Sequence, residues 1–343
     1  MDFTHFLSSH MMDKSYGGKR TYQDMVEQAV MADRVGYTAV VLPEHHLINI
    51  LMLPSPLQMA VKVSCLTKKI NLITSVAVLP IRDMRIFAGE VVQADMLCDG
   101  RLMLGVGRGA FAYEVGRLGT PIEITQRKFD ESLAVLEALL TEEEVSWDGE
   151  FYKFEPLTIM PRPMRPIPLM LAVMAPDKIY DGAKKGYNIQ TTPLRATHEY
   201  LLEQVNAFHR GKADAGEKGR GKRISLQRGM YLARDEADAK EKIAFAHEYY
   251  KRFDNVFTGP GVVHHGVIEP LPREQSAEEL GRNLVICPRS EMLDRLGAYA
   301  EAGIDEMIVT SNFGQPQEET LDMMQRLAEE IIPHFAARRS NAA

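Results

Sequence analysis

Three titratable side chains follow directly after a short apolar run near the start of the chain. The run 40–42 ends at Pro43 and is followed by Glu44, His45 and His46. In a parallel sheet that is covered on both faces, a buried strand delivers such side chains to the mouth at its carboxyl end. Histidine readily accepts and donates protons near neutral pH, and a neighbouring carboxylate can orient it. The pattern predicts either an acid–base group or a capped strand followed by two solvated histidines.

An arginine between glycines ends another apolar run. Residues 105–109 read Gly-Val-Gly-Arg-Gly, and Phe111 and Glu114 follow closely. Glycines let the backbone approach a ligand, and the guanidinium group of Arg108 can bind an anion. The segment therefore predicts a phosphate-binding site at the end of a strand.

Two further segments could contribute to the same anion site. Met174 and Ala175 precede a segment that reads as a helix from residue 177, and free N–H groups at a helix start bind phosphate. Arg127 lies early in another helical segment. It either adds a second positive charge to the site or pairs with Glu123 or Glu131 at the surface.

Two other kinds of chemistry fit the sequence less well. Neighbouring residues of an extended segment point to opposite sides, so Glu44, His45 and His46 cannot all bind one metal ion. No strand-like run is followed by Gly-x-Ser-x-Gly, the turn that presents a hydrolase serine. We therefore expect neither a metal site nor a serine hydrolase.

Strand-like apolar runs alternate with segments of helical periodicity along the chain. The runs are 3–7, 38–43, 70–80, 101–106, 167–175, 188–192, 224–233 and 306–310. This alternation predicts an α/β fold, a single (β/α)8 TIM barrel that forms one domain over residues 1–343. The rival is a doubly wound open sheet, but no glycine-rich dinucleotide motif follows the first strand.

Two stretches interrupt the alternation. Over residues 144–166, after the fourth helix, prolines at 156, 161, 163 and 166 predict an excursion across the barrel surface. Over residues 253–285, after the seventh strand, glycines and prolines without a sustained apolar period predict a long mobile loop. Such a loop is either a lid over the site or a disordered segment without a function.

The overall composition limits the compartment and the binding partners that we expect for the protein. A net charge of −7 and a pI of about 5.9 argue against nucleic-acid binding. The three cysteines lie far apart and form no disulfide framework. The chain shows no signal-peptide pattern and no apolar stretch long enough to cross a bilayer. We therefore expect a cytoplasmic protein that binds neither nucleic acid nor a membrane.

Several of these segments together resemble a known family. They are Leu-Pro-Glu-His-His at 42–46, residues 71–80, Gly-Arg-Leu-Met-Leu-Gly-Val-Gly-Arg-Gly at 100–109, Leu-Gly-Thr at 118–120, and Arg127. In this order they are similar to the bacterial luciferase-like flavin-dependent monooxygenases. The similarity runs from Met1 to the last helix and is most specific in residues 1–200.

The resemblance implies a monooxygenase that receives reduced FMN from a flavin reductase. It would use O2 to oxygenate a small substrate through a flavin peroxide. Because the residues at the mouth contain no arginine cluster beyond the phosphate pair, we expect this substrate to be uncharged and apolar. The implied catalytic residues are His45, Glu44 and Glu114. The implied cofactor-binding residues are Ser75 and Val76, joined by a non-proline cis peptide against the flavin, with Gly107, Arg108, Arg127, Met174 and Ala175. The implied substrate pocket contains His10, Met11 and Phe111.

The chain departs from the luciferases proper at one implied flavin contact. They have a cysteine where this chain has Gly107, so we expect open space beside the flavin and no light emission. Two alternatives stay open: a deazaflavin-dependent oxidoreductase that transfers hydride without oxygen, and a non-catalytic flavin-binding subunit. The resemblance also implies a homodimer, with helices near 56–66 and 85–97 as candidate contacts.

Overall fold

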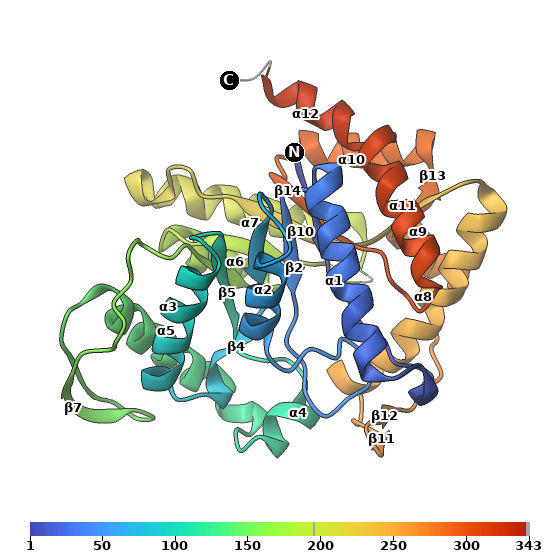
Figure 1. The fold of residues 1–343 in the computed structure, drawn as a ribbon. Helices are drawn as coiled ribbons and strands as arrows, with labels where there is room; N and C mark the ends of the chain where they lie inside the picture. The colour runs from blue at the N-terminus through green and yellow to red at the C-terminus, as the bar shows by residue number, and fades with distance from the viewer. Residues whose placement is uncertain (195, 341–343) are drawn as a thin grey trace.

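Parallel strands form a closed barrel at the centre of the molecule (Figure 1). The computed structural model describes residues 1–194 and 196–340. In order around the barrel, the strands are β1 (Asp2–Phe6), β2 (Ala39–Leu42), β3 (Asn71–Thr74), β5 (Leu102–Gly107), β8 (Leu169–Ala172), β9 (Asn188–Thr191), β10 (Ile224–Ala233) and β14 (Glu306–Thr310). Pairing of β14 with β1 and of β10 with β9 closes the ring. The predicted TIM barrel is confirmed; Arg195 and residues 341–343 of the predicted domain lie outside the described residues.

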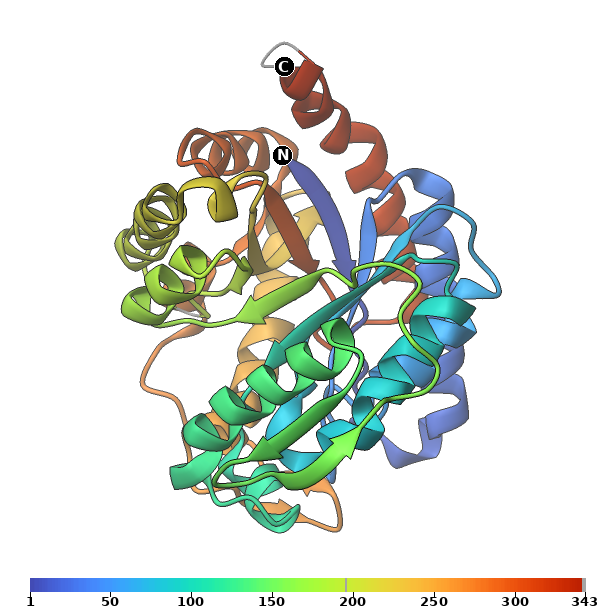
Figure 2. The same cartoon turned by 90° about the vertical axis from the view of Figure 1, so that its left-hand side faces the viewer.

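Helices cover the outside of the barrel (Figures 1 and 2). They are α1 (Gly18–Val35), α2 (Pro56–Ser64), α3 (Met84–Leu97), α4 (Ala112–Arg117), α5 (Thr125–Thr141), α6 (Pro176–Lys184), α7 (His198–Asp214), α8 (Glu236–Phe257), α9 (Ala277–Asn283), α10 (Arg289–Glu301), α11 (Gln317–Glu330) and α12 (Ile332–Ser340). None of the described helices is both long and apolar enough to span a bilayer. Because all barrel strands run in parallel, their carboxyl ends meet at one mouth, where side chains that follow them can converge.

The interior of the barrel changes from polar to apolar and back along the strands. Near the amino ends, the Glu306 carboxylate accepts hydrogen bonds of 2.5 Å from the hydroxyl groups of Thr4 and Ser225. The middle layer is apolar and consists of Phe6, Ala39, Val41, Leu51, Ile73, Met170 and Ile308. Polar side chains return beyond this layer, with Gln227 on β10 and Thr310 on β14. A layer of apolar side chains therefore lies beneath the polar mouth of the barrel.

The predicted strand 70–80 is two short strands. β3 ends at Thr74, and the Ser75–Val76 peptide that follows is cis, as the resemblance implies. β4 (Ala77–Val78) then pairs with the end of β5. The backbone between β3 and β4 thus lies beside the end of β5 at the mouth.

The two predicted interruptions contain more regular structure than their composition indicates. Residues 144–166 include an antiparallel hairpin of β6 (Val145–Asp148) and β7 (Lys153–Leu157), which projects from the barrel beside α5 (Figure 1). Residues 253–285 include the last turn of α8, a small hairpin of β11 (Val263–His264) and β12 (Val267–Ile268), and α9. The strand β13 (Val285–Pro288) then pairs with the second half of β10.

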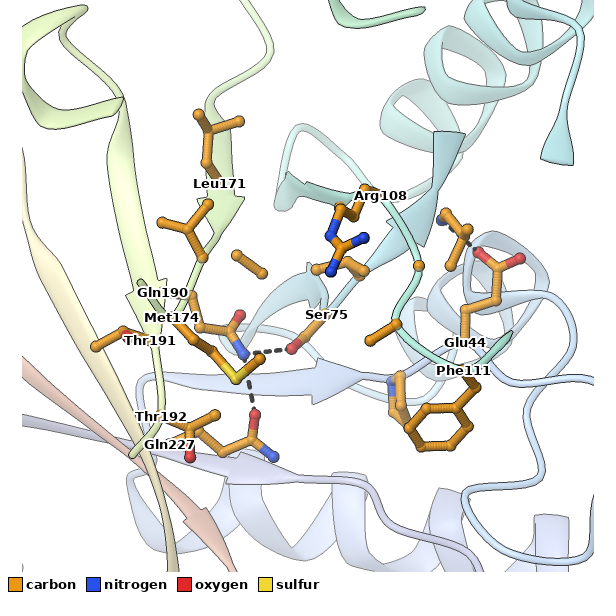
Figure 3. Close-up of a pocket in the computed structure, with 18 of the residues that line it drawn as sticks. Glu44, Ser75, Arg108, Phe111, Leu171, Met174, Gln190, Thr191, Thr192 and Gln227 are labelled. Carbon is orange, nitrogen blue, oxygen red and sulfur yellow. Dashed lines mark hydrogen bonds between the residues drawn. The ribbon is translucent and has the colours of Figure 1, made fainter. Parts of the chain in front are cut away.

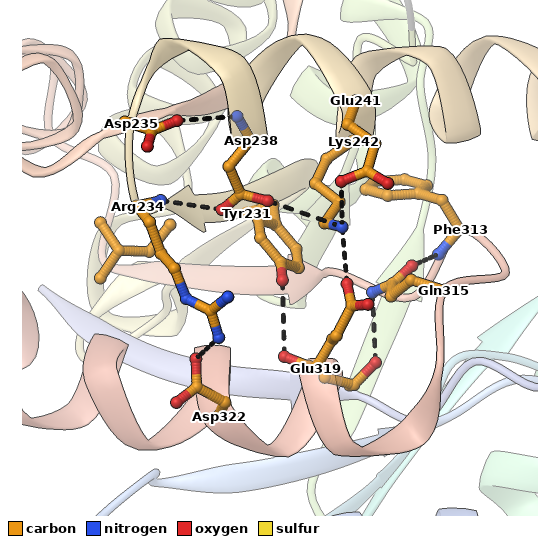
Figure 4. A network of polar contacts seen from close by, with 12 residues as sticks. Tyr231, Arg234, Asp235, Asp238, Glu241, Lys242, Phe313, Gln315, Glu319 and Asp322 are labelled. Carbon is orange, nitrogen blue, oxygen red and sulfur yellow. Dashed lines mark hydrogen bonds and ion pairs between the residues drawn. The ribbon is translucent and has the colours of Figure 1, made fainter.

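Helix α8 is fixed to α11 through a buried ammonium group (Figure 4). The side chain of Lys242 on α8 is 3% exposed and lies 2.6 Å from Glu319 of α11 and 3.0 Å from Glu241. Burial lowers the pKa of Lys242, but its contacts with these carboxylates outweigh burial and raise it. A buried cation without partners would be strongly destabilising, so this network fixes the position of α8 on the barrel.

The side chain of His5, on β1, packs against α1. Its Nε2 atom lies 3.0 Å from Gln28 Oε1, and its ring is edge-on to Tyr37. Burial lowers the pKa of His5 from 6.5 to about 4, although the hydrogen bond with Gln28 acts in the opposite direction. The imidazole is therefore neutral in the folded protein above that pH. In the unfolded chain it takes up a proton as the pH falls through 6.5.

We expect the contribution of His5 to stability to be complete above pH 6.5 and to be lost as the pH falls towards 4. The full change corresponds to about 3 kcal/mol. In urea unfolding at about pH 7 and pH 4.5, His5→Gln should show a smaller pH dependence than the wild type. The same substitution at His264, which is exposed, is the control and should follow the wild type. Identical pH dependence of His5→Gln and the wild type would contradict the lowered pKa of His5.

Candidate active site

A cavity of about 880 Å³ opens at the carboxyl ends of the barrel strands (Figure 3). Ten of the predicted site residues line it: Glu44, His45, Ser75, Val76, Gly107, Arg108, Phe111, Glu114, Met174 and Ala175. The other three, His10, Met11 and Arg127, are not among its lining residues. Segments at the ends of four different strands, far apart in the sequence, therefore meet around one cavity.

His45 forms a pair with a buried carboxylate. Its Nδ1 atom lies 3.0 and 3.2 Å from the two carboxylate oxygens of Glu114, which is 5% exposed and belongs to α4. The backbone N–H of His46 donates to the same carboxylate at 2.9 Å. An acceptor at Nδ1 favours the imidazole tautomer with its proton there, which leaves Nε2 able to accept a proton. The pair is therefore a candidate general base oriented by a carboxylate.

The face of the His45 imidazole is covered by an aromatic ring. Phe111 stacks on it with ring centroids 4.3 Å apart and an angle of 27° between the planes. Phe253 and Phe257 of α8 contact Phe111 edge-on, at 5.4 and 6.0 Å. Phe111 directly precedes α4, so the same short helix supplies both the stacking ring and the carboxylate that hold the imidazole.

Glu44, predicted as a catalytic residue, is occupied by structural contacts. Its carboxylate is fully buried and lies 2.7 Å from both His46 Nε2 and the guanidinium group of Arg82. It also accepts a hydrogen bond of 2.9 Å from the backbone N–H of Val78. The contacts join the end of β2 to the segment that follows β3, so Glu44 positions the neighbouring residues of the site.

A row of polar side chains crosses the bottom of the cavity (Figure 3). Gln190 Nε2 donates to Ser75 Oγ at 2.5 Å and to Gln227 Oε1 at 3.1 Å, and Gln227 Nε2 donates to Thr310 Oγ1 at 3.2 Å. Gln190 Oε1 and Thr191 Oγ1 are buried without a hydrogen-bond partner among the described residues. Buried polar atoms normally have partners, so these two oxygens indicate a place where a ligand is bound.

Gly107 does not leave the open space that its lack of a side chain predicts. A Cβ atom at this position would lie 2.7 Å from Cγ2 of Val76, which faces it across the sheet. The side chain of Val76 therefore fills the room that a cysteine would need. The sequence did not reveal this because the two residues are far apart along the chain.

Positive charge and free N–H groups both belong to the lining of the cavity. Arg108 uses one guanidinium nitrogen to donate to Thr125 Oγ1 at 3.2 Å, which leaves its other N–H groups available. Helix α6 begins after Ala175 without a side-chain cap, and Lys178 in its first turn also lines the cavity. Uncapped N–H groups beside cations bind phosphate well.

Of the two positions that the sequence left open for Arg127, the structure shows the one at the surface, with Glu150 in place of Glu123 or Glu131 as its partner. Its guanidinium group is 63% exposed and lies 3.2 Å from Glu150, so it faces away from the cavity. Gln126 and Asp130, four residues apart on α5, line the cavity instead. Each helix residue is rotated by about 100° from the previous one, so a shift of one position decides which side chain faces the site.

His10 and Met11 lie behind the cavity wall. His10 Nε2 is 2.9 Å from the carbonyl oxygen of Asn312, its ring packs on Tyr249 at 4.9 Å, and burial lowers its pKa to about 4. The backbone of Met11 is hydrogen-bonded to Asn49 in both directions. These contacts draw the segment after β1 towards residues 49–50 and away from the mouth.

Several lining residues were not predicted as site residues. They are Gln190, Gln227, Tyr249, Tyr250, Phe253 and Phe257. A glutamine inside an apolar strand is a signal that could have revealed the first two. Aromatic residues spaced by four along one helix could have revealed the face of α8 that turns to the cavity.

The chain belongs to the luciferase-like monooxygenase family, whose model matches residues 1–306. It is 27% identical to the oxygenase component of the flavin-dependent trigonelline monooxygenase of Acinetobacter baylyi, over 98% of this chain and 96% of that protein. It is 25% identical to an F420-dependent glucose-6-phosphate dehydrogenase of Beutenbergia cavernae, over 92% and 94% of the two chains. The crystal structure of the monooxygenase RslO1 from Streptomyces bottropensis has the same fold, with a TM-score of 0.84, 21% identity and coverage of 98% and 100%.

We expect Gly107→Ala to lower the melting temperature, because the new Cβ would press on the stiff, branched side chain of Val76. Overpacking of this kind typically costs ~1–3 kcal/mol. The double variant Val76→Ala with Gly107→Ala should recover most of the loss. Gly116→Ala is the matched control, because a Cβ there meets nothing within 4 Å. A Gly107→Ala protein as stable as the wild type would refute the close contact.

Proposed function

We propose that this chain is the oxygenase component of a two-component flavin-dependent monooxygenase. It would take reduced FMN from a separate flavin reductase and use O2 to oxygenate a small, uncharged substrate. The observation that carries the proposal is the His45–Glu114 pair in the same cavity as Arg108 and the start of α6. The relative from Acinetobacter baylyi, an oxygenase component, supports it.

The residues present fit a phosphorylated flavin. Arg108, Lys178 and the uncapped start of α6 form a donor set suited to a phosphate group. The unpartnered oxygen of Gln190, which lies beside Ser75 and Gln227 at the bottom of the cavity, would hydrogen-bond the polar edge of the ring system. When bound, reduced FMN would supply two electrons to O2, so that one oxygen atom enters the substrate and the other leaves as water.

In this proposal His45 handles protons. Its Nε2 atom makes no hydrogen bond with a described residue, whereas Nδ1 is held by Glu114. When Nε2 accepts a proton, the positive charge on the ring is stabilised by the carboxylate only 3.0 Å away. Phe111 keeps the ring in one orientation and shields one of its faces from water.

A second function within the family is hydride transfer with a deazaflavin. It is favoured by the F420-dependent relative, which is aligned over 92% of this chain. The same donor set could hold the phosphate of either cofactor. The two are separated by mixing the chain with each reduced cofactor and O2, because only the monooxygenase should consume oxygen with formation of an oxygenated product.

We also propose a homodimer that uses the surface around α2 and α3. Leu66, Ile86 and Leu97 are large apolar side chains near these two helices, and they are 47%, 65% and 53% exposed. Large apolar side chains that are exposed on or near two helices packed against each other favour a protein contact over solvent.

We expect Arg108→Ala to weaken the binding of oxidised FMN by roughly tenfold to a hundredfold, the range for a lost hydrogen bond to a charged group. Binding of riboflavin, which has no phosphate, should change little. Fluorescence titration measures both. Arg127→Ala is the matched control and should leave both affinities unchanged, because that guanidinium group faces Glu150. An equal loss in the two variants would show that Arg127 also reaches the phosphate.

We expect His45→Ala to reduce turnover by roughly 10²–10⁴-fold, the usual effect of removing a positioned acid–base group. Glu114→Gln should give a smaller loss, because the imidazole stays in place but its positive charge loses a partner. Oxygen uptake with a flavin reductase measures both, and FMN affinity should be preserved. His264→Gln on β11 serves as the control. Wild-type turnover in His45→Ala would remove His45 from the mechanism.

A further inference from the structure

One wall of the cavity consists of aromatic rings in contact with one another. Phe111, Tyr249, Phe253 and Phe257 form this aromatic wall, and all four line the cavity. The ring of Phe253 lies 5.9 Å from Tyr249, 5.3 Å from Phe257 and 5.4 Å from Phe111. Three of the rings come from positions four residues apart on α8, so they face the same side of that helix. Aromatic rings at such distances favour another ring as the next neighbour.

The aromatic wall carries one polar group that lacks a partner. Tyr249 is 5% exposed, and its hydroxyl group makes no hydrogen bond with any described residue. Burial raises the pKa of this phenol well above its ordinary value, and the nearby Asp254 carboxylate raises it further. The hydroxyl group therefore stays protonated and can donate a hydrogen bond. Because Tyr249 lines the cavity, its hydroxyl group is available to an acceptor on a bound ligand.

The surroundings of the aromatic wall disfavour an anionic ligand. Among the described residues, the cations that line the cavity are Arg108, Lys178, Lys185 and Arg228. Arg108 contacts α5, and Figures 1 and 2 show α5 and α8 on different sides of the barrel. Arg228 donates to the carbonyl groups of Leu194 and Ala196. Asp254, next to Phe253 on α8, lies 3.2 Å from Arg273, so the guanidinium group of Arg273 already has an anionic partner.

We propose that the substrate is an uncharged aromatic or heteroaromatic compound with an oxygen acceptor, whose ring lies against the aromatic wall and whose oxygen accepts a hydrogen bond from Tyr249. This inference rests on the proposed function, because it names the substrate of the same cavity. The His45 imidazole, stacked on Phe111 at the edge of the wall, would then lie beside the bound ring. Van der Waals contact with the rings would supply the affinity, and the single donor would set the orientation.

The test compares four small probes that differ by one feature each. Acetophenone has the ring and the oxygen, cyclohexyl methyl ketone has a saturated ring, ethylbenzene lacks the oxygen, and benzoate adds a charge. Dissociation constants are measured by ligand-observed NMR titration of the full chain, without cofactor and again with oxidised FMN. Neither measurement needs turnover, so failure of the chain to consume oxygen would overturn the proposed function while leaving this result readable.

We expect acetophenone to bind roughly two- to tenfold more tightly than cyclohexyl methyl ketone, the range for an added ring–ring contact. Tyr249→Phe should weaken acetophenone binding roughly three- to tenfold, the range for one neutral hydrogen bond. The same variant should leave ethylbenzene binding unchanged. Tyr22→Phe on α1 is the matched control, because it removes a hydroxyl group outside the cavity. Phe253→Leu should erase the preference for the aromatic ketone over the saturated one.

Equal affinity for the aromatic and saturated ketones, or tighter binding of benzoate than of acetophenone, would overturn the proposal. So would an equal effect of Tyr249→Phe on acetophenone and ethylbenzene. The probe series on the wild-type chain tests the ring and charge preferences even where a variant is unstable. Melting temperatures of the variants separate a local effect on binding from a loss of folded protein.

Discussion

The site depends on the burial of the Glu44 carboxylate. A carboxylate taken out of water must be matched by donors, and three converge on it: the Arg82 guanidinium group, the His46 imidazole and the N–H group of Val78. Two of these donors come from the chain after β3, and one from the residue two positions along from Glu44 itself. The carboxylate thus fixes the exit of β2 against the neighbouring strand, and His45 is held between two anchored residues.

His45 in turn is held from two directions by one short segment. Phe111 and Glu114 are three residues apart at the start of α4, so the ring and the carboxylate reach the imidazole together. Phe253 of α8 packs against Phe111, and α8 is fixed to α11 through Lys242. The orientation of the imidazole is therefore set by contacts that run from the site to the outer layer of the barrel.

The sequence was sufficient to predict the barrel and the site residues that follow its strands. All eight strands were predicted, because buried parallel strands read as apolar runs, and the place of His45 and Arg108 followed from their position after such runs. It was not sufficient where the direction of a side chain decides whether the residue lines the cavity. Arg127 differs from the lining residue Gln126 by one helix step, and His10 is drawn away by a bridge to Ile50. The filling of the Gly107 position by Val76 depends on a contact between β5 and the connection from β3 to β4, which no local pattern encodes.

Strand β13 limits how far the segment after α8 can depart from the barrel. It lies on the second half of β10, so the chain that departs from the barrel at the end of α8 rejoins the same sheet only 28 residues later, at Val285. The side-chain amide of Asn255, in the last turn of α8, forms hydrogen bonds with the backbone of Val262 and Glu269 in this segment. This segment is joined to the barrel at both ends, and the hydrogen bonds of Asn255 hold it near the end of α8, so it stays close to the barrel.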